Sequence, residues 1–362
     1  MPSALPPTLD LSLGVNGGDD LALVKRVMHA YRRAAALFVG SQGPWDTSLV
    51  ALKRPVHDAL IGDDVGRAAA VLRDPAASAF FWGFDATATG PAGEPEPHEL
   101  VLRRLSRTDW RELYALWICD GLLSLSEAIG ARRADYPEIK IDATLEARSR
   151  LFDVDAVIDE IERETGVVLN FPNPFPNELG LPSKRGIISF RAVQSVYQGW
   201  RVAQFARGNP DFAVLEIGAG LGRTTYFASL FGVKNYTIVD IPLTNAAQGY
   251  FLGRVMGDEH VALGDEANKR NLRIVPSADL ENLDGTYNLI VNVDSLTEMP
   301  PDVAQRYWNF ARKAGCTVLS INHEANSHTV RELYKYEIGA RAFRYPYPMR
   351  RGYVEEIVSF AV

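Results

Sequence analysis

The sequence has few cysteines and histidines, no excess of basic residues and no long hydrophobic run. Its two cysteines, Cys119 and Cys316, lie far apart and can form neither a disulfide framework nor a cysteine zinc cluster. The longest apolar stretches, such as residues 289–293, are far too short to span a bilayer. Residues 1–13 lack the basic region and the apolar core of a secretory signal. These absences predict a cytoplasmic protein that binds no membrane.

The charge balance argues against another class of partner. A broad nucleic-acid footprint needs clustered lysine and arginine side chains to displace counterions, whereas the formal net charge here is −7. Hydrophobic residues make up 47% of the chain and charged residues 23%, which is typical of a globular protein. We therefore expect no nucleic-acid partner, and nothing in the sequence sets the oligomeric state.

The first half of the chain has helical periodicity. Apolar residues recur at helical spacing over residues 19–39, 56–72, 109–129 and 153–165. Segment 171–181 contains three prolines, and we expect a loop there because proline removes backbone donors. A chain of 362 residues exceeds the size at which one core usually stops growing. The prediction is a mainly helical N-terminal domain over residues 1–185, which would cover the acceptor, and a second domain over residues 186–362.

From residue 186 onward, short apolar runs alternate with helical segments. The strand candidates are residues 213–217, 236–239, 272–275, 289–293 and 317–321. The helix candidates are residues 224–231, 243–256, 302–313 and 329–338. Short, continuously apolar strands separated by helices predict a parallel sheet covered on both faces. The runs 340–345 and 353–362 have no helix between them, so we expect an antiparallel hairpin to complete a seven-stranded, mostly parallel α/β sheet.

A glycine-rich turn follows the first of these strands. Gly218 and Gly220 would let the backbone approach a ligand closely, and Gly222 stands just before a helix. Dinucleotide enzymes use the pattern G-x-G-x-x-G, but here Arg223 occupies the last position. Glu216 lies two residues before the first glycine; a carboxylate there is awkward beside a pyrophosphate and suits the ammonium group of S-adenosylmethionine (SAM). The turn therefore favours SAM over NAD.

Three residues at later strand ends complete the expected cofactor site. Asp240 ends the second strand about 20 residues after the glycines, where a ribose diol needs acceptor oxygens. Asp279 follows the third strand, where a side chain can bond the adenine amino group, and Asn292 at the end of the fourth strand joins the set. Two alternatives stay open. Asp240 could cap the helix that begins near Pro242, and Asp279 could be a solvated turn residue.

Glu216, the glycines of the turn, Asp240 and Asp279 together resemble the class I SAM-dependent methyltransferases. This resemblance implies a Rossmann-like cofactor domain. A narrower resemblance, to the sugar O-methyltransferases, rests on residues 80–85, 171–180, 185–189 and 292–300. It implies a sugar, or a small molecule that contains one, as the methyl acceptor.

The loops after the fourth and fifth strands carry the candidate catalytic residues. In open parallel sheets ligands bind beyond the C-terminal ends of the strands, so residues 292–300 and 322–328 would lie over the methyl group of SAM. A hydroxyl is a poor nucleophile, and a general base should take its proton. We expect His323 to be that base, with Glu298 or Asp294 orienting it or acting as the base itself. His323 could instead cap a helix, and Glu298 could form a structural salt bridge.

The same loops raise the question of a metal ion. Asp294, Glu298, His323 and Glu324 form a group from which a divalent cation site could be assembled, and magnesium prefers carboxylate oxygens and water. No tight Asp-Asp or His-x-Asp spacing favours such a site. We therefore assign no metal ligand, and magnesium stays an alternative that the sequence does not favour.

The sequence thus predicts a SAM-dependent O-methyltransferase that acts on a hydroxyl of a sugar or sugar-containing small molecule and releases S-adenosylhomocysteine. The alternatives are a methyltransferase of a non-sugar natural product, an NAD-dependent oxidoreductase, and a SAM-binding scaffold without catalysis. A nucleic-acid methyltransferase is disfavoured by the acidic charge. Segment 292–295 also lacks the Pro-Pro-aromatic motif expected for amino-group targets.

Overall fold

The computed structural model describes residues 8–14, 20–38, 52–81, 84, 110–133, 153–266, 271–283 and 285–360. The chain divides into two compact units. The front unit comprises residues 1–18 and 73–198, and the sheet unit comprises residues 19–72 and 199–362. This division differs from the expected boundary at 185/186 chiefly because residues 19–72 belong with the sheet. No helix in these described ranges is both long and apolar enough to cross a membrane.

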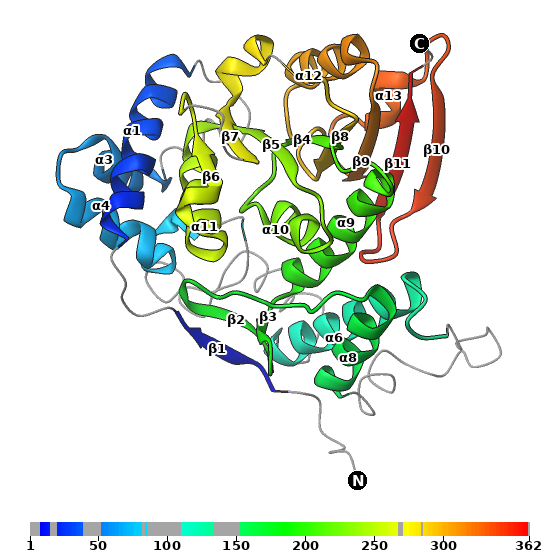
Figure 1. The fold of residues 1–362 in the computed structure, drawn as a ribbon, viewed down its shortest axis with the longest axis horizontal. Coiled ribbons are helices and arrows are strands. Elements are labelled where there is room, and N and C mark those ends of the chain that lie inside the picture. The colour runs from blue at the N-terminus through cyan, green and yellow to red at the C-terminus, as the bar shows by residue number, and fades with distance from the viewer. Residues whose placement is uncertain are drawn as a thin grey trace. The chain divides into compact units, whose positions relative to one another are not determined.

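The sheet unit is built on an eight-stranded sheet of order β10-β11-β9-β8-β4-β5-β7-β6 (Figure 1). Its strands are β4 (Ala213–Ile217), β5 (Asn235–Asp240), β6 (Val261–Leu263), β7 (Leu272–Pro276), β8 (Leu289–Val293), β9 (Thr317–His323), β10 (Arg341–Pro346) and β11 (Tyr353–Ser359). Strands β4 to β9 pair in parallel, and β11 is antiparallel to both β9 and β10. The expected α/β fold with a C-terminal hairpin is confirmed. The expected count of seven strands is wrong, because β6 adds an eighth that is too short to leave a sequence pattern.

Helices cover both faces of this sheet. The helices of the sheet unit are α1 (Leu21–Leu37), α3 (Arg54–Ile61), which packs against α1, α4 (Val65–Arg73), the C-terminal part of α9 (Phe190–Ala206), α10 (Arg223–Leu230), α11 (Pro242–Met256), α12 (Pro301–Ala314) and α13 (Val330–Tyr334), with short 3-10 turns η5 (Asp258–His260) and η6 (Ser277–Asn282). Figure 1 shows α10 and α11 on one side of the sheet and α12 on the other. Successive side chains of β4 point to opposite faces of the sheet, and Leu215 and Ile217 pack in the core with Trp308 of α12. Glu216, between them, points to the opposite face, toward α10.

Helix α1 packs against α11, although we expected it in the N-terminal domain. The two helices lie so close that a Cβ added at Gly253 would stand 2.7 Å from Leu23 Cδ1. The Asp20 carboxylate accepts hydrogen bonds from the Tyr250 hydroxyl at 2.6 Å and from Arg254 at 3.0 Å. The helical spacing of α1 indicates its buried face, but periodicity carries no information about the element that covers that face.

The front unit combines helices with a small antiparallel sheet of order β1-β2-β3. Its elements are β1 (Asp10–Leu13), η1 (Pro75–Ala77), η2 (Ala79–Phe81), α6 (Trp110–Ala128), α8 (Val154–Thr165), β2 (Pro176–Ser183) and β3 (Gly186–Ile188). The expectation of a loop over residues 171–181 is wrong for its second half, which lies in β2. Pro176 is the first residue of that strand, a position where proline is tolerated because no donor is needed there.

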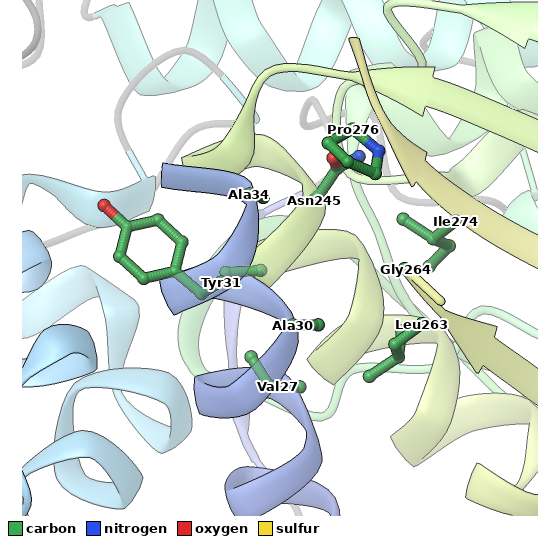
Figure 2. Close-up of a pocket in the computed structure, with 10 residues that line it drawn as sticks. Val27, Ala30, Tyr31, Ala34, Asn245, Leu263, Gly264, Ile274 and Pro276 are labelled. Carbon is green, nitrogen blue, oxygen red and sulfur yellow. The ribbon is translucent and has the colours of Figure 1, made fainter. Parts of the chain in front are cut away.

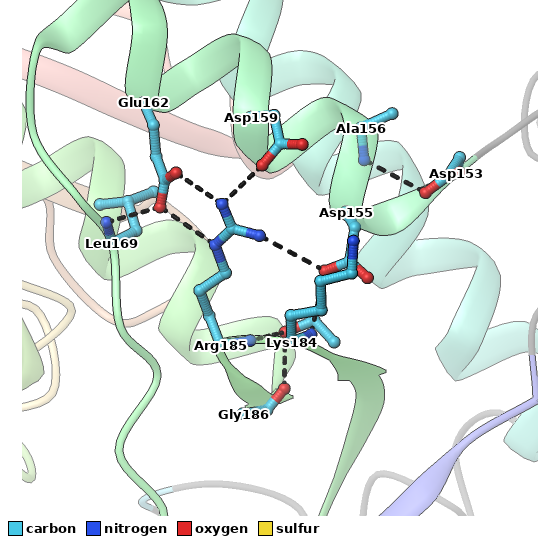
Figure 3. A network of polar contacts seen from close by, with 10 residues as sticks. Asp153, Asp155, Ala156, Asp159, Glu162, Leu169, Lys184, Arg185 and Gly186 are labelled. Carbon is cyan, nitrogen blue, oxygen red and sulfur yellow. Dashed lines mark hydrogen bonds and ion pairs between the residues drawn. The ribbon is translucent and has the colours of Figure 1, made fainter.

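Arg185, in the turn between β2 and β3, joins the small sheet to α8 (Figure 3). Its guanidinium lies 2.6 Å from Glu162 Oε2, 2.5 Å from Asp159 Oδ1 and 3.7 Å from Asp155 Oδ1. Glu162 and Asp159 raise the pKa of the guanidinium, and its hydrogen bond to Glu162 is the largest cause. Arg185 begins one of the segments that resemble the sugar methyltransferases, and here its contacts hold the front unit together.

Candidate functional site

The glycine turn lies between the carboxyl end of β4 and the start of α10. Gly218, Gly220 and Gly222 have φ angles of +69°, +56° and +89°, which other residues rarely adopt. A Cβ at Gly218 would collide with Ser295 and one at Gly222 with Leu252, whereas one at Gly220 would have no described atom within 4 Å. Gly220 is therefore the glycine that borders open space, where a ligand can approach the backbone.

Glu216 lies beneath this turn with 1% of its surface exposed. Its Oε2 accepts hydrogen bonds from the Tyr236 hydroxyl at 2.8 Å and from Thr225 Oγ1 at 3.1 Å. Burial raises the pKa of Glu216 to about 7, and these two hydrogen bonds oppose the shift. The carboxyl group therefore links β4 to β5 and α10 around the turn. Its effect on a ligand ammonium group stays a prediction.

Asp240 is joined to the glycine turn through Gln248, a residue of α11 that sequence reasoning missed. Gln248 Nε2 donates to Asp240 Oδ2 at 2.7 Å and to the carbonyl oxygen of Gly220 at 2.9 Å. The backbone N–H of Ile241 donates to Asp240 Oδ1 at 2.8 Å. Burial raises the pKa of Asp240 to about 7, and the hydrogen bonds from Ile241 and Gln248 oppose this. The acidic residue and the open glycine thus form one hydrogen-bonded unit.

A second missed residue, Lys53, is buried near Asp240. It precedes α3, and only 4% of its surface is exposed. Burial lowers the pKa of Lys53 to about 8, and the negative charge of Asp240 opposes that shift. No motif could have identified this lysine, because it lies far from Asp240 in the sequence and comes near it only in the folded sheet unit.

Asp279 lies in η6, directly after β7, and is half-buried. The sheet register pairs Asp240 with Pro276, so η6 begins beside the end of β5. A neighbouring pocket is lined by residues of α1, α11, β6 and β7, with Tyr31, Asn245 and Pro276 among its walls (Figure 2). The pairing of Asp279 with adenine stays a prediction.

Asn292 is fully buried and bonded to protein groups. Its Nδ2 donates to the carbonyl oxygen of Ile217 at 2.9 Å and to Ser295 Oγ. Its Oδ1 accepts from Asn322 Nδ2 at 2.8 Å. These contacts hold the carboxyl ends of β4, β8 and β9 together. The structure therefore shows Asn292 supporting the site, and its expected contact with the cofactor stays a prediction.

The three candidate catalytic residues come together at the ends of β8 and β9. One ligand atom each from Asp294, Glu298 and His323 lies within 4.8 Å of the others. His323 Nε2 stands 3.6 Å from Asp294 Oδ1. The parallel pairing of Val293 with Ile321 explains the meeting, because it brings the two strand ends side by side. Carboxylate and imidazole groups at this spacing can exchange a proton, and they could also hold a divalent cation.

Two further side chains of the C-terminal hairpin reach this cluster, and sequence reasoning missed both. The antiparallel register of β11 and β9 places Tyr353 opposite His323. The rings of Tyr353 and His323 pack edge to face at 5.3 Å, and the Tyr353 hydroxyl donates to Asp294 Oδ2 at 2.8 Å. Arg350 Nη1 lies 3.7 Å from the same oxygen, and its guanidinium stacks on Tyr353 at 4.3 Å. Asp294 is therefore the residue that holds the others in place.

The hydrogen bonding of His323 limits what its ring can do. Nδ1 accepts a hydrogen bond from the backbone N–H of Ala325 at 3.2 Å. A neutral imidazole carries one N–H, so this bond places the proton on Nε2, which faces Asp294. In that tautomer neither ring nitrogen has a free lone pair for the proton of an acceptor, which favours the other base that the sequence analysis named, the carboxylate of Glu298. The role of His323 as the base stays a prediction.

Comparison with known proteins adds the following findings. No family model matches the sequence, and no curated protein matches it. Among solved structures, the magnesium protoporphyrin IX methyltransferase ChlM from Synechocystis PCC 6803 with bound SAM is 17% identical, with a TM-score of 0.33, over 46% of this chain and 83% of that one. The CcbJ methyltransferase from Streptomyces caelestis is 14% identical, with a TM-score of 0.34, over 46% and 90%. The ribosomal protein L11 methylase from Lactobacillus delbrueckii subsp. bulgaricus is 12% identical, with a TM-score of 0.34, over 46% and 79%.

The segments behind the narrower resemblance divide between the units. Residues 292–300 contribute Asp294 and Glu298 to the cluster, whereas residues 171–180 and 185–189 lie in the front unit. Of residues 80–85, Phe80, Phe81 and Phe84 are buried, and the others lie outside the described residues. Of these four segments, residues 292–300 contribute to the candidate site.

Proposed function

We propose that this protein is a SAM-dependent methyltransferase. The observation that carries the proposal is the unit formed by Gly220, Gln248 and Asp240, in which Gln248 Nε2 donates both to the carbonyl oxygen of an open glycine and to a buried carboxyl group. A ligand that contains a ribose diol matches these features. The diol can donate to Asp240, and the backbone at Gly220 allows the rest of the ligand to approach closely. Glu216 beneath the turn would favour the positive charge of SAM.

The competing cofactor, NAD, fits this turn less well. Arg223 stands where a dinucleotide fingerprint has its third glycine. Only 8% of Arg223 is exposed, and its guanidinium lies over the ring of Phe251 at 5.7 Å. The start of α10 is therefore occupied by a packed cationic side chain where the dinucleotide fold brings helix and strand close together.

When bound, SAM would supply an activated methyl group. The residues of this chain would do the rest. The acceptor hydroxyl would be positioned over the cluster at the ends of β8 and β9, which accounts for much of the rate. Glu298 would take its proton, while Asp294, held by Tyr353 and Arg350, fixes the ring of His323.

We further propose that the acceptor is a sugar hydroxyl, on the strength of the resemblance of residues 292–300 and the three other segments to the sugar O-methyltransferases. A natural-product acceptor without a sugar is the second candidate, since the described geometry at Glu298 accepts a proton from any hydroxyl. The net charge of −7 favours a small molecule over a nucleic acid.

Calorimetric titration with SAM, S-adenosylhomocysteine and NAD tests the cofactor directly. We expect saturable binding of the two sulfur nucleosides and none of NAD, with and without magnesium. Binding of NAD alone would overturn the proposal. If binding of SAM is confirmed, a panel of sugar and non-sugar alcohols with labelled SAM then separates the two acceptor classes.

The affinity for SAM should depend on pH. Burial raises the pKa of both Glu216 and Asp240 to about 7, so both groups are largely neutral at about pH 6 and must ionise to attract a cation and accept from a diol. We expect the affinity to rise as the pH increases from about 6 to 8 and then to level off, by up to about tenfold per pH unit for each group below its pKa. Titration calorimetry across this range provides the measurement. A flat profile would contradict the ionised state of both carboxyl groups in the complex.

The stability of the ligand-free protein should change with pH in the opposite direction. A carboxyl group with a raised pKa stabilises the fold at a pH below its ordinary pKa, and this contribution is lost as the pH rises through about 7. The melting temperature without SAM should therefore fall as the pH rises from the ordinary pKa values of 4.5 and 3.8 to about 7, and then level off. Glu216→Gln should reduce this fall.

A further inference from the structure

The outer edge of the eight-stranded sheet is an exposed strand. β10 is hydrogen-bonded to β11 on one side, and within the described residues no strand pairs with its other side. All six residues of β10 are exposed. The opposite edge differs, because the three residues of β6 are all buried. The sheet therefore offers one open edge.

This edge lacks most of the features that usually protect an open strand. Natural edges carry charged residues, especially lysines, internal prolines or bulges that prevent pairing with another chain. β10 has no lysine, its one proline is the last residue, and its register with β11 runs without a shift from Arg341 to Pro346. Of its two arginines, Arg344 is paired with carboxylates of its own chain. Phe343 and Tyr345 are 56% and 50% exposed, and a regular edge strand with exposed aromatic side chains is a surface for strand pairing.

We propose that this edge pairs with β10 of a second copy of the chain, so that the protein is a homodimer with one continuous sheet. A two-fold axis perpendicular to the sheet requires one residue of β10 to face its own copy. If that residue is Phe343, the two phenylalanines face each other and each Arg341 stands opposite Tyr345 of the second copy. These are an aromatic pair and two cation–aromatic pairs, and both kinds stabilise neighbouring strands.

The other face of the strand is compatible with the same register. Ala342 of each copy then stands opposite Arg344 of the other, so no two like charges meet. Arg344 is already neutralised within its own chain, since it lies 2.6 Å from Glu324 Oε2 and 3.2 Å from Glu356 Oε1. A register centred on Arg344 would instead bring two arginines face to face, which destabilises a strand pair. The arrangement of charge along β10 thus matches a copy of itself.

The oligomeric state of the full chain tests the proposal. Light scattering coupled to size-exclusion chromatography should give about twice the 40.0 kDa mass of one chain. Phe343→Lys places two like charges at the centre of the interface and should yield the monomer. Leu37→Lys is the matched control, because Leu37 is 50% exposed, close to the 56% of Phe343, but lies on α1; this variant should remain a dimer. A monomeric wild-type protein, or a Phe343→Lys variant that stays dimeric, would overturn the proposal.

A mixing experiment tests the register and guards against loss of folding. Phe343→Lys and Phe343→Glu should each be monomeric with the melting temperature of the control variant. Mixed in equal amounts, they should form a heterodimer, since lysine then faces glutamate across the axis. A mixture that stays monomeric would show that residue 343 does not face its own copy. The readout is mass alone, so it is independent of SAM binding and of the proposed enzymatic activity.

Discussion

Replacing Glu298 with glutamine should lower the turnover number by about 10²- to 10⁴-fold, the usual contribution of a general base. The amide keeps the size of the side chain but cannot accept a proton, and the ring of His323 cannot replace it while Nδ1 accepts from Ala325 and Nε2 faces Asp294. The affinity for SAM should stay within about twofold of the wild type, because Glu298 lies at the ends of β8 and β9. Methyl transfer under single-turnover conditions measures the effect.

The comparison with His323→Gln distinguishes the two assignments of the base. If Glu298 accepts the proton, His323→Gln should cost about tenfold or less, through looser packing against Tyr353. If His323→Gln instead costs 10²-fold or more while Glu298→Gln is nearly silent, the base is the histidine that sequence reasoning selected. The same assays repeated with a chelator show whether the cluster also uses a divalent cation.

Asp240→Asn should weaken SAM binding by about 10- to 100-fold. Hydrogen bonds to a charged group contribute about 1.5–3 kcal/mol. The substitution keeps the size of the side chain but removes the charge and one of the two acceptor oxygens, which accept from Ile241 and Gln248. The variant should still unfold cooperatively at pH 8 without SAM, because relief from burying an ionised carboxyl group offsets the lost hydrogen bond. Loss of binding is then separable from loss of folding.

Asp302→Asn is a suitable control for this experiment, since Asp302 is an exposed aspartate in the first turn of α12. Its affinity for SAM should equal that of the wild type. An Asp240→Asn variant that also binds SAM normally would show that Asp240 only connects the glycine turn to α11. The proposed contact with the ribose would then be wrong.

Sequence patterns predict the central part of the fold well because its strands are buried on both sides. Residues 213–217 and 289–293, each apolar except for one polar residue (Glu216 and Asn292), coincide with β4 and β8. Patterns fail where an element is short or is defined by its partners. β6 has three residues, and β2 contains two prolines but pairs through Gly180 and Leu181 with β1 and β3. Local composition carries little of that information.

The same division holds for the candidate site. Asp294 and His323 follow adjacent parallel strands, so the rule that strand ends meet at one edge predicts their contact. Lys53 and Tyr353 reach the site from distant parts of the chain, and the register of β11 against β9 decides the position of Tyr353. The assignment of the base depends on one hydrogen bond, from Ala325 to His323. A pattern of residue types does not reveal it.

The contact between α1 and α11 has a consequence for how the protein is made. Asp20 and Tyr250 are 230 residues apart, and the front unit is translated almost entirely between them. At about 5–20 residues per second, α1 leaves the ribosome roughly 10 to 50 s before α11. During that interval the apolar face of α1 around Leu23 has no groove to enter. Nascent chains should therefore depend on chaperones until translation reaches α11, and a fragment of residues 199–362 alone should aggregate through the uncovered surface at Gly253.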